Sequence, residues 1–338
     1  MENRLFKWLA TLLVLIVILL GVSALSLSLG PSGLHAGRIL RLILGRQGTA
    51  TEYAILFDIR LPRILLGFAI GGALSLSGVM LQAMFRNPLV EPYTLGISGG
   101  AALGVSLGTI LGLTGLLGVY TLPAFGFLGA ACVIVFLSIG INRSVLNLQG
   151  LLLTGVMISF ISSSAVLLIM SISRVEDLHG ILFWIIGSLG ETDWLPVKLA
   201  LVAAISGLVV SYFFCFDLNA LSLGEEHALH LGVNVERTKR LVLLLASILT
   251  GLSVSLVGAI GFVGLVVPHF VRMFAGTDHR ILLVSSFISG AIFLIFCDAV
   301  AKSAAQPLEL PVGVVTGLLG GVLFIYAMMR RPSTTGGR

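Results

Sequence analysis

Long apolar segments follow one another along nearly the whole chain of 338 residues. Most of them are close to 20 residues long, which is the length an α-helix needs to cross the ~30 Å hydrocarbon core of a bilayer. Only 10% of the residues are charged, whereas a typical soluble domain carries about 25%. So few charges could not cover the surface of a soluble protein, and the sequence therefore predicts a polytopic membrane protein.

The apolar segments are continuous rather than alternating, which favours helices over the strands of about ten residues found in a transmembrane barrel. Turn and charge signals divide them into about ten predicted spans of an all-α membrane protein. We expect a single transmembrane domain over residues 1–338, without a soluble domain. The eighth span is short and contains Pro268, so a half-length or kinked helix is expected there. The predicted spans cover residues 8–29, 63–84, 95–117, 121–141, 150–172, 194–216, 240–261, 262–275, 281–298 and 311–329.

More than half of the 20 lysines and arginines fall on one side of this arrangement. Because an even number of spans puts both termini on the same side, the basic excess marks the side of the termini as cytoplasmic. The net charge of +5 is explained by this topology and does not indicate nucleic-acid binding. A second basic group lies outside, before the second span, where residues 35–46 predict an amphipathic helix at the outer interface. The tail at 332–338 is predicted to be disordered.

The predicted spans hold almost no ionisable side chains at depth, apart from His269 and Arg272 in the eighth span. Lys198 and Asp298 lie near span ends, where their charges could reach the interface. Ion-driven transporters usually bury carboxylates or histidines, so this pattern argues against a secondary transporter or channel working alone, although backbone carbonyls could still bind sodium. A membrane-embedded enzyme would require a polar constellation within the spans, and the sequence shows none.

The chain has no phosphate-binding loop of its own. None of its lysines follows a glycine, so the GxxxxGK[ST] pattern that cradles nucleotide phosphates is excluded. If transport uses ATP, the nucleotide and its Mg²⁺ must be bound by a separate subunit.

Glycine is frequent, with 41 residues, and in the third predicted span it recurs at every fourth position from Gly96 to Gly112. This spacing places a bare ridge on one helix face, which suits either tight packing against a neighbouring helix or a translocation path. A short similarity joins LSLSGV at 74–79 to LSVSLV at 252–257. It is compatible with an inverted-topology duplication or with chance.

A polar stretch, EEHALHLGVNVERTKR at residues 225–240, interrupts the apolar sequence between the sixth and seventh spans. Two short helical pieces are predicted to meet at Gly232 on the cytoplasmic side. Such a compact unit suits docking against a soluble protein, and an ordinary solvated loop is the alternative. The two histidines are not expected to bind metal. The expected apolar face consists of Leu223, Ala228 and Leu231, with Glu225 and Glu226 presented beside it.

Three further stretches carry a family resemblance. They are RLPRILLGFAIGGALSLSGVMLQAMFRNPLVEPYTLGISGGAALG (60–104), GFVGLVVPHFVRMFAGTDHRILL (261–283) and ELPVGVVTGLLGGVLFIYAMMRR (309–331). These stretches closely resemble the FecCD family of ABC-importer permeases, the ten-span subunits that import iron–siderophore complexes, haem or cobalamin. The resemblance covers nearly all of the chain beyond the first span.

The resemblance implies a type II ABC importer permease fold and a set of partners. It implies a second permease copy, giving a homodimer or a pair with a related chain, two cytosolic ATPase subunits that bind ATP and Mg²⁺, and an extracytoplasmic substrate-binding protein. The chain would lie in a bacterial or archaeal cell membrane, the inner membrane if Gram-negative, and would be neither an enzyme nor a holder of a cofactor. Ferric siderophore or haem is the expected cargo, with cobalamin or a molybdate-type oxyanion as alternatives.

The resemblance also implies roles for particular residues. The loop at about 217–240 would be the element that seats in the ATPase, through a pattern matched by Leu223, Gly224, Ala228, Leu231 and Gly232, with Glu225 and Glu226 inside it.

Docking and gating residues are implied in the same way. Arg60 and Arg63 would grip acidic side chains of the binding protein, the alternative being lipid phosphates. Lys302 stands where the cobalamin member has a third arginine, and a lysine lacks the bidentate geometry. The cytoplasmic gate would correspond to Asn147, Leu148 and Gln149, although the sequence NLQG does not match the small hydroxyl residues of the cobalamin member.

Overall fold

The protein is a bundle of helices in the computed structural model, which describes residues 2–30, 36–43, 45, 48–113, 116, 118–142, 147–190, 193–305 and 308–329. Eight helices are long and apolar enough to cross a membrane, and two shorter apolar helices accompany them. The described part of the chain contains no strand. The prediction of an all-α protein with about ten spans is confirmed. The predicted tail at 332–338 lies outside the described residues.

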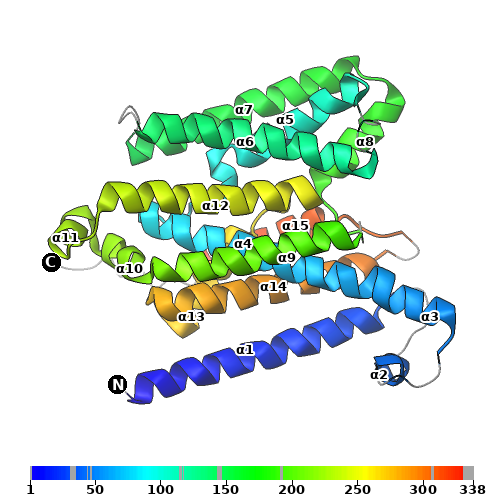
Figure 1. Ribbon diagram of the computed structural model, residues 1–338, viewed down its shortest axis with the longest axis horizontal. Helices are drawn as coiled ribbons and strands as arrows, with labels where there is room; N and C mark the ends of the chain where they lie inside the picture. The colour runs from blue at the N-terminus through cyan, green and yellow to red at the C-terminus, as the bar shows by residue number, and fades with distance from the viewer. Residues whose placement is uncertain are drawn as a thin grey trace.

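The spans run roughly side by side along the long axis of the molecule (Figure 1). The ten spans are α1 (Glu2–Ser28), α4 (Leu61–Phe85), α5 (Ile97–Ile110), α6 (Thr121–Asn142), α7 (Leu148–Ile172), α9 (Trp194–Phe213), α12 (Val235–Val257), α13 (Val263–Ala275), α14 (His279–Ser303) and α15 (Val312–Met329). The shorter elements are α2 (Ala36–Ile43), α3 (Ala50–Ala54), η1 (Ile55–Arg60), η2 (Pro92–Leu95), η4 (Gly118–Tyr120), α8 (Val175–Ile186), α10 (Cys215–Leu223) and α11 (Glu225–His230).

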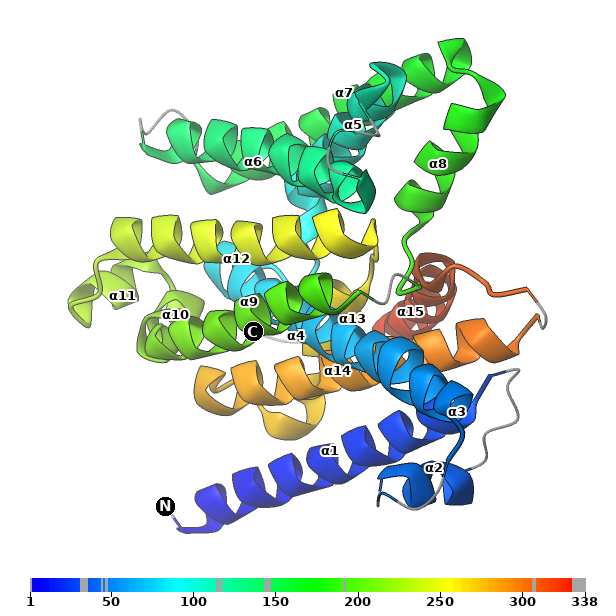
Figure 2. The ribbon, with the colours of Figure 1, turned by 45° about the vertical axis from the view of Figure 1, so that its right-hand side comes forward.

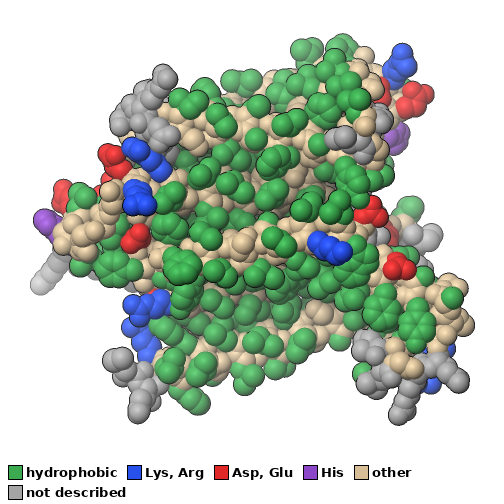
Figure 3. Space-filling model, viewed as in Figure 1, with side chains coloured by type: hydrophobic (Ala, Val, Ile, Leu, Met, Phe, Trp, Pro, Cys, Tyr) green, Lys and Arg blue, Asp and Glu red, His purple; other side chains and the backbone are tan. Residues whose placement is uncertain are grey.

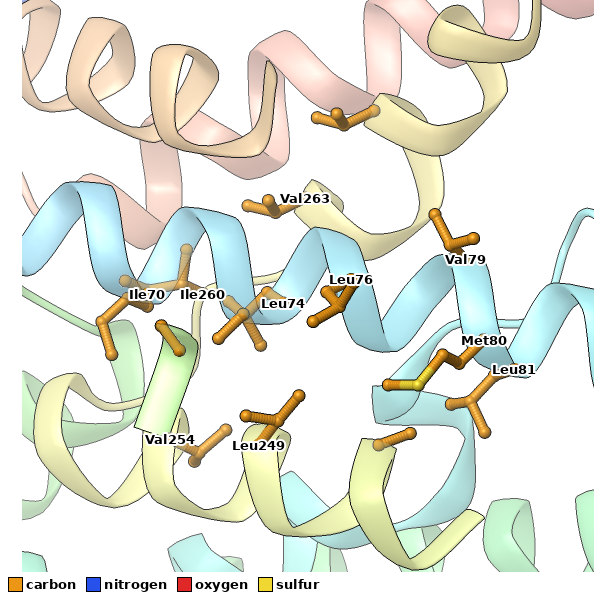
Figure 4. Packing of buried hydrophobic residues seen from close by; sticks show 14 of the residues in the cluster. Ile70, Leu74, Leu76, Val79, Met80, Leu81, Leu249, Val254, Ile260 and Val263 are labelled. Atoms are coloured by element: carbon orange, nitrogen blue, oxygen red, sulfur yellow. The ribbon is translucent and has the colours of Figure 1, made fainter. Parts of the chain in front are cut away.

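Helix α4 is the centre of the bundle. It packs against α9, α12, α13 and α14, whereas α1 lies at the periphery against α14 (Figure 2). In the continuous helix Ala50–Phe85, 89% of the most apolar 18-residue window is buried, whereas in α1 the corresponding share is 11%. Figure 4 shows Leu249 and Val254 of α12 on one side of α4 and Val263 of α13 on the other. Helix α4 is therefore shielded from lipid along its length.

The outer surface has the pattern of a protein that faces hydrocarbon. Hydrophobic side chains cover the width of the molecule, and charged side chains gather mainly toward its two ends (Figure 3). The N-terminus and α11 lie at the same end, with α2, α3 and α8 at the other (Figure 1).

Glycines permit the closest helix contacts. A Cβ at Gly78 of α4 would lie 1.9 Å from the carbonyl oxygen of Gly264 in α13, and one at Gly71 would lie 2.3 Å from that of Gly290 in α14. In the predicted glycine ridge of α5, a Cβ at Gly104 would lie 2.3 Å from the Phe125 carbonyl oxygen of α6. This ridge therefore packs tightly against a neighbouring backbone, as one of the two interpretations of its sequence predicted.

Two spans, of 14 and 13 residues, are shorter than the others, which have 18 to 27 residues, and each follows a long central helix. Helix α4 is followed by an irregular segment and α5, and α12 by a shorter irregular segment and α13. Helices α4 and α12 run in opposite directions (Figure 1), and they carry the two similar sequences at 74–79 and 252–257. This arrangement is the one that an inverted-topology duplication produces.

The structure corrects one prediction and adds to another at the end of the bundle opposite α11. The second span does not begin at residue 63 but continues a helix from Ala50, through the π-helical turn η1, for 36 residues. The amphipathic helix α2 is present, and part of its apolar face is covered by the protein itself, because Ile39 and Leu42 are buried against Leu56 of η1. The sequence shows that α2 has an apolar face but not which surface covers it.

Candidate functional site

The polar stretch at 225–240 belongs to a folded unit (residues 217–240), which we call the coupling loop after the role that the family resemblance implies. Most of α10, then α11, and the first turns of α12 enclose a small core of Ala220, Leu221, Ala228, Val233 and Val235. Gly224 joins α10 to α11 with a φ of +123°, and Gly232 ends α11 with a φ of +81°. Only glycine adopts such angles readily, so both predicted glycines have a local structural reason.

Polar side-chain contacts hold the coupling loop together and attach it to the bundle. Lys239 Nζ lies 2.6 Å from Glu225 Oε2, joining α12 to α11. Thr238 Oγ1 donates to Asp217 Oδ2 at 2.9 Å. Asn219 accepts a hydrogen bond from the His279 backbone N–H at 3.0 Å, which fixes α10 to the start of α14. A unit that is closed by two internal contacts and attached to α14 by a third differs from an ordinary solvated loop.

One residue of the predicted apolar face is placed differently. Ala228 is fully buried in the core of the coupling loop, whereas Leu223 and Leu231 are 67% and 52% exposed. Leu229, at 60% exposure, joins them instead. The reason is the phase of α11, which begins at Glu225 and turns position 228 toward the loop's own core. The exposed apolar surface therefore consists of three leucines, beside the exposed Glu226 and half-buried Glu225.

The predicted gate residues lie next to the coupling loop. Asn147 caps the first turn of α7 by accepting a hydrogen bond from the Gly150 N–H at 2.7 Å, and Leu148 and Gln149 begin the helix. These three residues line a pocket of about 520 Å³, which also borders Arg86, Glu225, Glu236, Lys239 and Arg240. Positions more than 70 residues apart in sequence are thus brought together, which the sequence did not predict.

At the opposite end two of the three predicted docking cations, Arg63 and Lys302, belong to a largely buried ion cluster. The Arg63 guanidinium contacts Asp298 Oδ1 at 2.8 Å and Glu309 Oε2 at 2.7 Å, and Lys302 Nζ lies 2.6 Å from Asp298 Oδ2. Arg63 and Lys302 are each 7% exposed. Arg60, 6% exposed, hydrogen-bonds to the backbone carbonyl of Leu27 in α1. We call Arg63, Asp298, Lys302 and Glu309 the outer ion cluster.

Asp298 is the functional-site residue that sequence reasoning misplaced. We expected it to reach the interface from a span ending at 298, but α14 continues to Ser303, and the Asp298 side chain is 2% exposed. In the longer helix Asp298 and Lys302 stand four residues apart on one face, the spacing of a helical ion pair. This four-residue spacing is the sequence signal from which the Asp298–Lys302 ion pair could have been predicted.

A third polar group explains Pro268, for which the sequence offered only a kink. A proline at 268 has no N–H to give to the carbonyl of Gly264 four residues earlier. Gln82 of α4 satisfies this carbonyl with its Nε2–H at 3.0 Å, and Arg272 donates to Gln82 Oε1 at 2.5 Å. The break in helical bonding is thus repaired by a neighbouring span, as membrane helices require.

A lipid-facing bundle with two broken central spans and a compact polar unit at one end defines the membrane-spanning subunit of a transporter. The chain belongs to the FecCD transport family, which matches residues 14–330.

Individual relatives support this assignment over nearly the whole length. The chain is 38% identical to the hemin transport system permease protein HmuU of Yersinia pestis over 325 residues, 95% of this chain and 94% of that protein. It is 39% identical to the Fe(3+) dicitrate transport system permease protein FecD of Escherichia coli over 289 residues, 86% of this chain and 89% of that protein. A solved structure of a metal-chelate type ABC transporter in an inward-facing conformation matches with a TM-score of 0.82 and 30% identity, covering 96% of this chain and all of that one.

Proposed function

We propose that this chain is the permease subunit of an ATP-driven importer of metal chelates and that its coupling loop seats in a cytosolic ATPase subunit. The observation that carries the proposal is the coupling loop itself. It presents three exposed leucines on a small unit that is held together by the Lys239–Glu225 ion pair and attached to the start of α14. Exposed apolar groups clustered on a polar projection mark a protein-interaction surface.

The permease contributes the pathway, and the ATPase contributes the energy. ATP and Mg²⁺ bind to the partner subunits, so this chain is not an enzyme and needs no cofactor. Movement of the ATPase is delivered to the coupling loop and from there to α12, which starts inside the loop and crosses the whole bundle. The pocket between the coupling loop and the start of α7 lies where such movement would open or close the predicted gate at Asn147, Leu148 and Gln149.

The expected cargo is a ferric siderophore, haem or a related metal chelate. Relatives of 38% and 39% identity are named for hemin and Fe(3+) dicitrate transport, and the similar solved structure is of metal-chelate type. A pathway without fixed binding charges suits a bulky substrate that a binding protein delivers. A relative in Halobacterium salinarum named for cobalamin import, 39% identical over 281 residues, keeps cobalamin as the second candidate. A molybdate-type oxyanion is the third.

Two further partners complete the proposal. A second permease copy would form the other half of the pathway, most simply as a homodimer, and an extracytoplasmic binding protein would dock at the opposite end. Docking through Arg60, Arg63 and Lys302 requires access to buried cations. An acidic side chain of the binding protein would have to displace Glu309, whose side chain is 50% exposed, from Arg63.

The membrane location follows from the same assembly. We place the chain in a bacterial or archaeal cell membrane, the inner membrane in a Gram-negative cell, with both termini and the coupling loop in the cytoplasm. The N-terminus and the coupling loop lie at one end of the bundle (Figure 1), as this topology requires.

The test is co-purification from native membranes in mild detergent. We compare the wild type with a Leu223→Asp, Leu231→Asp double variant, since both side chains are exposed and their replacement leaves the core of the coupling loop intact. Met273→Asp serves as the matched control, because Met273 is 70% exposed in the last turn of α13, outside the coupling loop.

An ATPase that accompanies the wild type and the control but not the double variant supports the proposal. If no ATPase accompanies the wild type, and substrate uptake continues in vesicles without ATP, the chain is a transporter that works alone.

A further inference from the structure

The two helix breaks in the centre of the bundle are joined by side chains. The segment before α5 contains Glu91 and Tyr93, and the segment before α13 contains Ile260 and Phe262. The Tyr93 hydroxyl accepts a hydrogen bond from the Ile260 backbone N–H at 2.8 Å. The Glu91 carboxyl group lies close to the Phe262 backbone N–H. We call this contact between residues 91–93 and 260–262 the crossing.

The backbone at the crossing depends on these two acceptors. Residues 259–262 are not helical, so their N–H groups lack the carbonyl partners that a helix supplies, and an unpaired N–H inside a membrane bundle is costly. Ile260 is fully buried, and Figure 4 shows it beside Ile70 and Leu74 of α4. Phe262 has a φ of +68°, which a non-glycine residue keeps only where its surroundings hold it.

The same short turn contacts the helix that carries the predicted gate. A Cβ at Gly155 of α7 would lie 2.6 Å from the Leu95 Cα at the end of η2. A Cβ at Gly96 would lie 2.8 Å from the Gly155 carbonyl oxygen. These backbones touch without intervening side chains, so a shift of η2 is passed directly to α7. Gly155 lies two turns beyond Asn147, the first residue of the predicted gate.

The other side of the crossing leads to the coupling loop. Helix α12 begins within that loop, where Lys239 is paired with Glu225 at 2.6 Å, and ends at Val257, directly before the crossing. The chain of contacts is therefore continuous from the coupling loop through α12, the crossing and η2 to α7.

We propose that Glu91 and Tyr93 are positioning residues that transmit movement of the coupling loop to the gate end of α7. Without these contacts, α12 and α13 shift relative to η2, and α7 does not follow. This inference rests on the proposed function, because the movement it transmits starts at the ATPase.

The experiment reads the position of the gate directly and needs no substrate. A reporter chain carries Gln149→Cys at the exposed start of α7 together with Cys132→Ser, while Cys215 and Cys297 are buried. The purified permease–ATPase complex is placed in lipid nanodiscs, and a water-soluble maleimide labels the reporter without nucleotide and after trapping with ATP and vanadate. The ratio of the two labelling rates is the nucleotide response.

Three variants and two controls are made in this reporter. Tyr93→Phe removes only the hydroxyl, and Glu91→Leu removes the acceptor. Glu91→Gln keeps an amide carbonyl oxygen in its place, and it therefore tests rescue by a conservative change. The controls are Tyr212→Phe and Glu176→Gln, at exposed positions of α9 and α8.

Tyr93→Phe and Glu91→Leu are expected to reduce the nucleotide response by roughly 2- to 10-fold each, the effect of one hydrogen bond on an equilibrium. Glu91→Gln and the controls keep it, and ATP hydrolysis continues in all variants. A lower thermal stability with an unchanged nucleotide response overturns the inference, since the two residues are then merely structural. If the unmodified reporter shows no nucleotide response, the proposed function fails and the inference with it.

Discussion

Replacing Asp298 by asparagine tests whether the outer ion cluster is a buried structural unit. In the structure the Asp298 carboxylate is paired with two cations at once, Arg63 at 2.8 Å and Lys302 at 2.6 Å. The amide of asparagine has nearly the same shape but no charge. The substitution therefore leaves two cations in the interior with their common partner neutralised.

The expected cost follows from the burial of these groups. The side chains of Asp298, Arg63 and Lys302 are 2%, 8% and 8% exposed, so solvent screens them little. Removing one partner of a buried pair costs about 3–5 kcal/mol. Arg63 keeps Glu309, which limits the loss to the lower half of that range. Lys302→Met should cost less, because Asp298 then still has the bidentate Arg63.

The measurement is the free energy of unfolding in mixed micelles titrated with a denaturing detergent, followed by the fluorescence of the three tryptophans. The double variant Asp298→Asn, Lys302→Met completes a double-mutant cycle. Because it also removes one of the two cations whose shared carboxylate is neutralised, it should be about 1–3 kcal/mol more stable than the sum of the single effects predicts. Asp193→Asn, at an exposed position, is the matched control.

Two results would refute the reasoning. If Asp298→Asn costs no more than the exposed control, the cluster is not desolvated as the structure indicates. If the changes in unfolding free energy of the two single variants add up to that of the double variant, Asp298 and Lys302 do not stabilise each other.

Three other predictions concern packing and polar contacts, all read as unfolding free energies in the same assay. Gly78→Ala should destabilise by about 1–3 kcal/mol, since its Cβ would meet the Gly264 carbonyl at 1.9 Å. Gly317→Ala, with open space around it, should be neutral. Equal changes in the free energy of unfolding for the two variants would contradict the close approach at Gly78. Gln82→Leu should cost about 1–3 kcal/mol because it leaves a buried carbonyl unpaired, and a stabilising effect would show that this carbonyl has another donor. Glu309→Gln should cost less than about 1 kcal/mol, as expected for a half-exposed ion pair, and a loss as large as that of Asp298→Asn would contradict this division of roles.

The sequence was sufficient for those features of the protein that depend on neighbouring residues. Span length, apolar continuity and Pro268 predicted about ten helices and a half-length eighth span, and both are present. These features follow from the thickness of the bilayer and from backbone hydrogen bonding, which act along the chain. The coupling loop was also visible, because a charged stretch stands out between apolar spans.

The candidate site was only partly predictable. Gly224 and Gly232 have positive φ angles, which only glycine adopts readily. Their places in the coupling loop therefore depend on a local property of the backbone. The burial of Ala228 and the exposure of Leu229 depend on where α11 begins, and no single residue signals this. The position of this one helix boundary therefore decides which of the two side chains is buried and which is exposed.

Only the tertiary structure decided which charged and polar groups meet. Arg63 and Asp298 are 235 residues apart, and the sequence shows two charges near span ends with no means of pairing them. The contacts of Gln82 with Gly264 and of Tyr93 with Ile260 join residues that are 182 and 167 positions apart. The physical reason is the same in each case. Helices form from local periodicity, whereas the pairing of buried polar groups is set by how glycine-lined helices approach one another, and that geometry exists only once the bundle has packed.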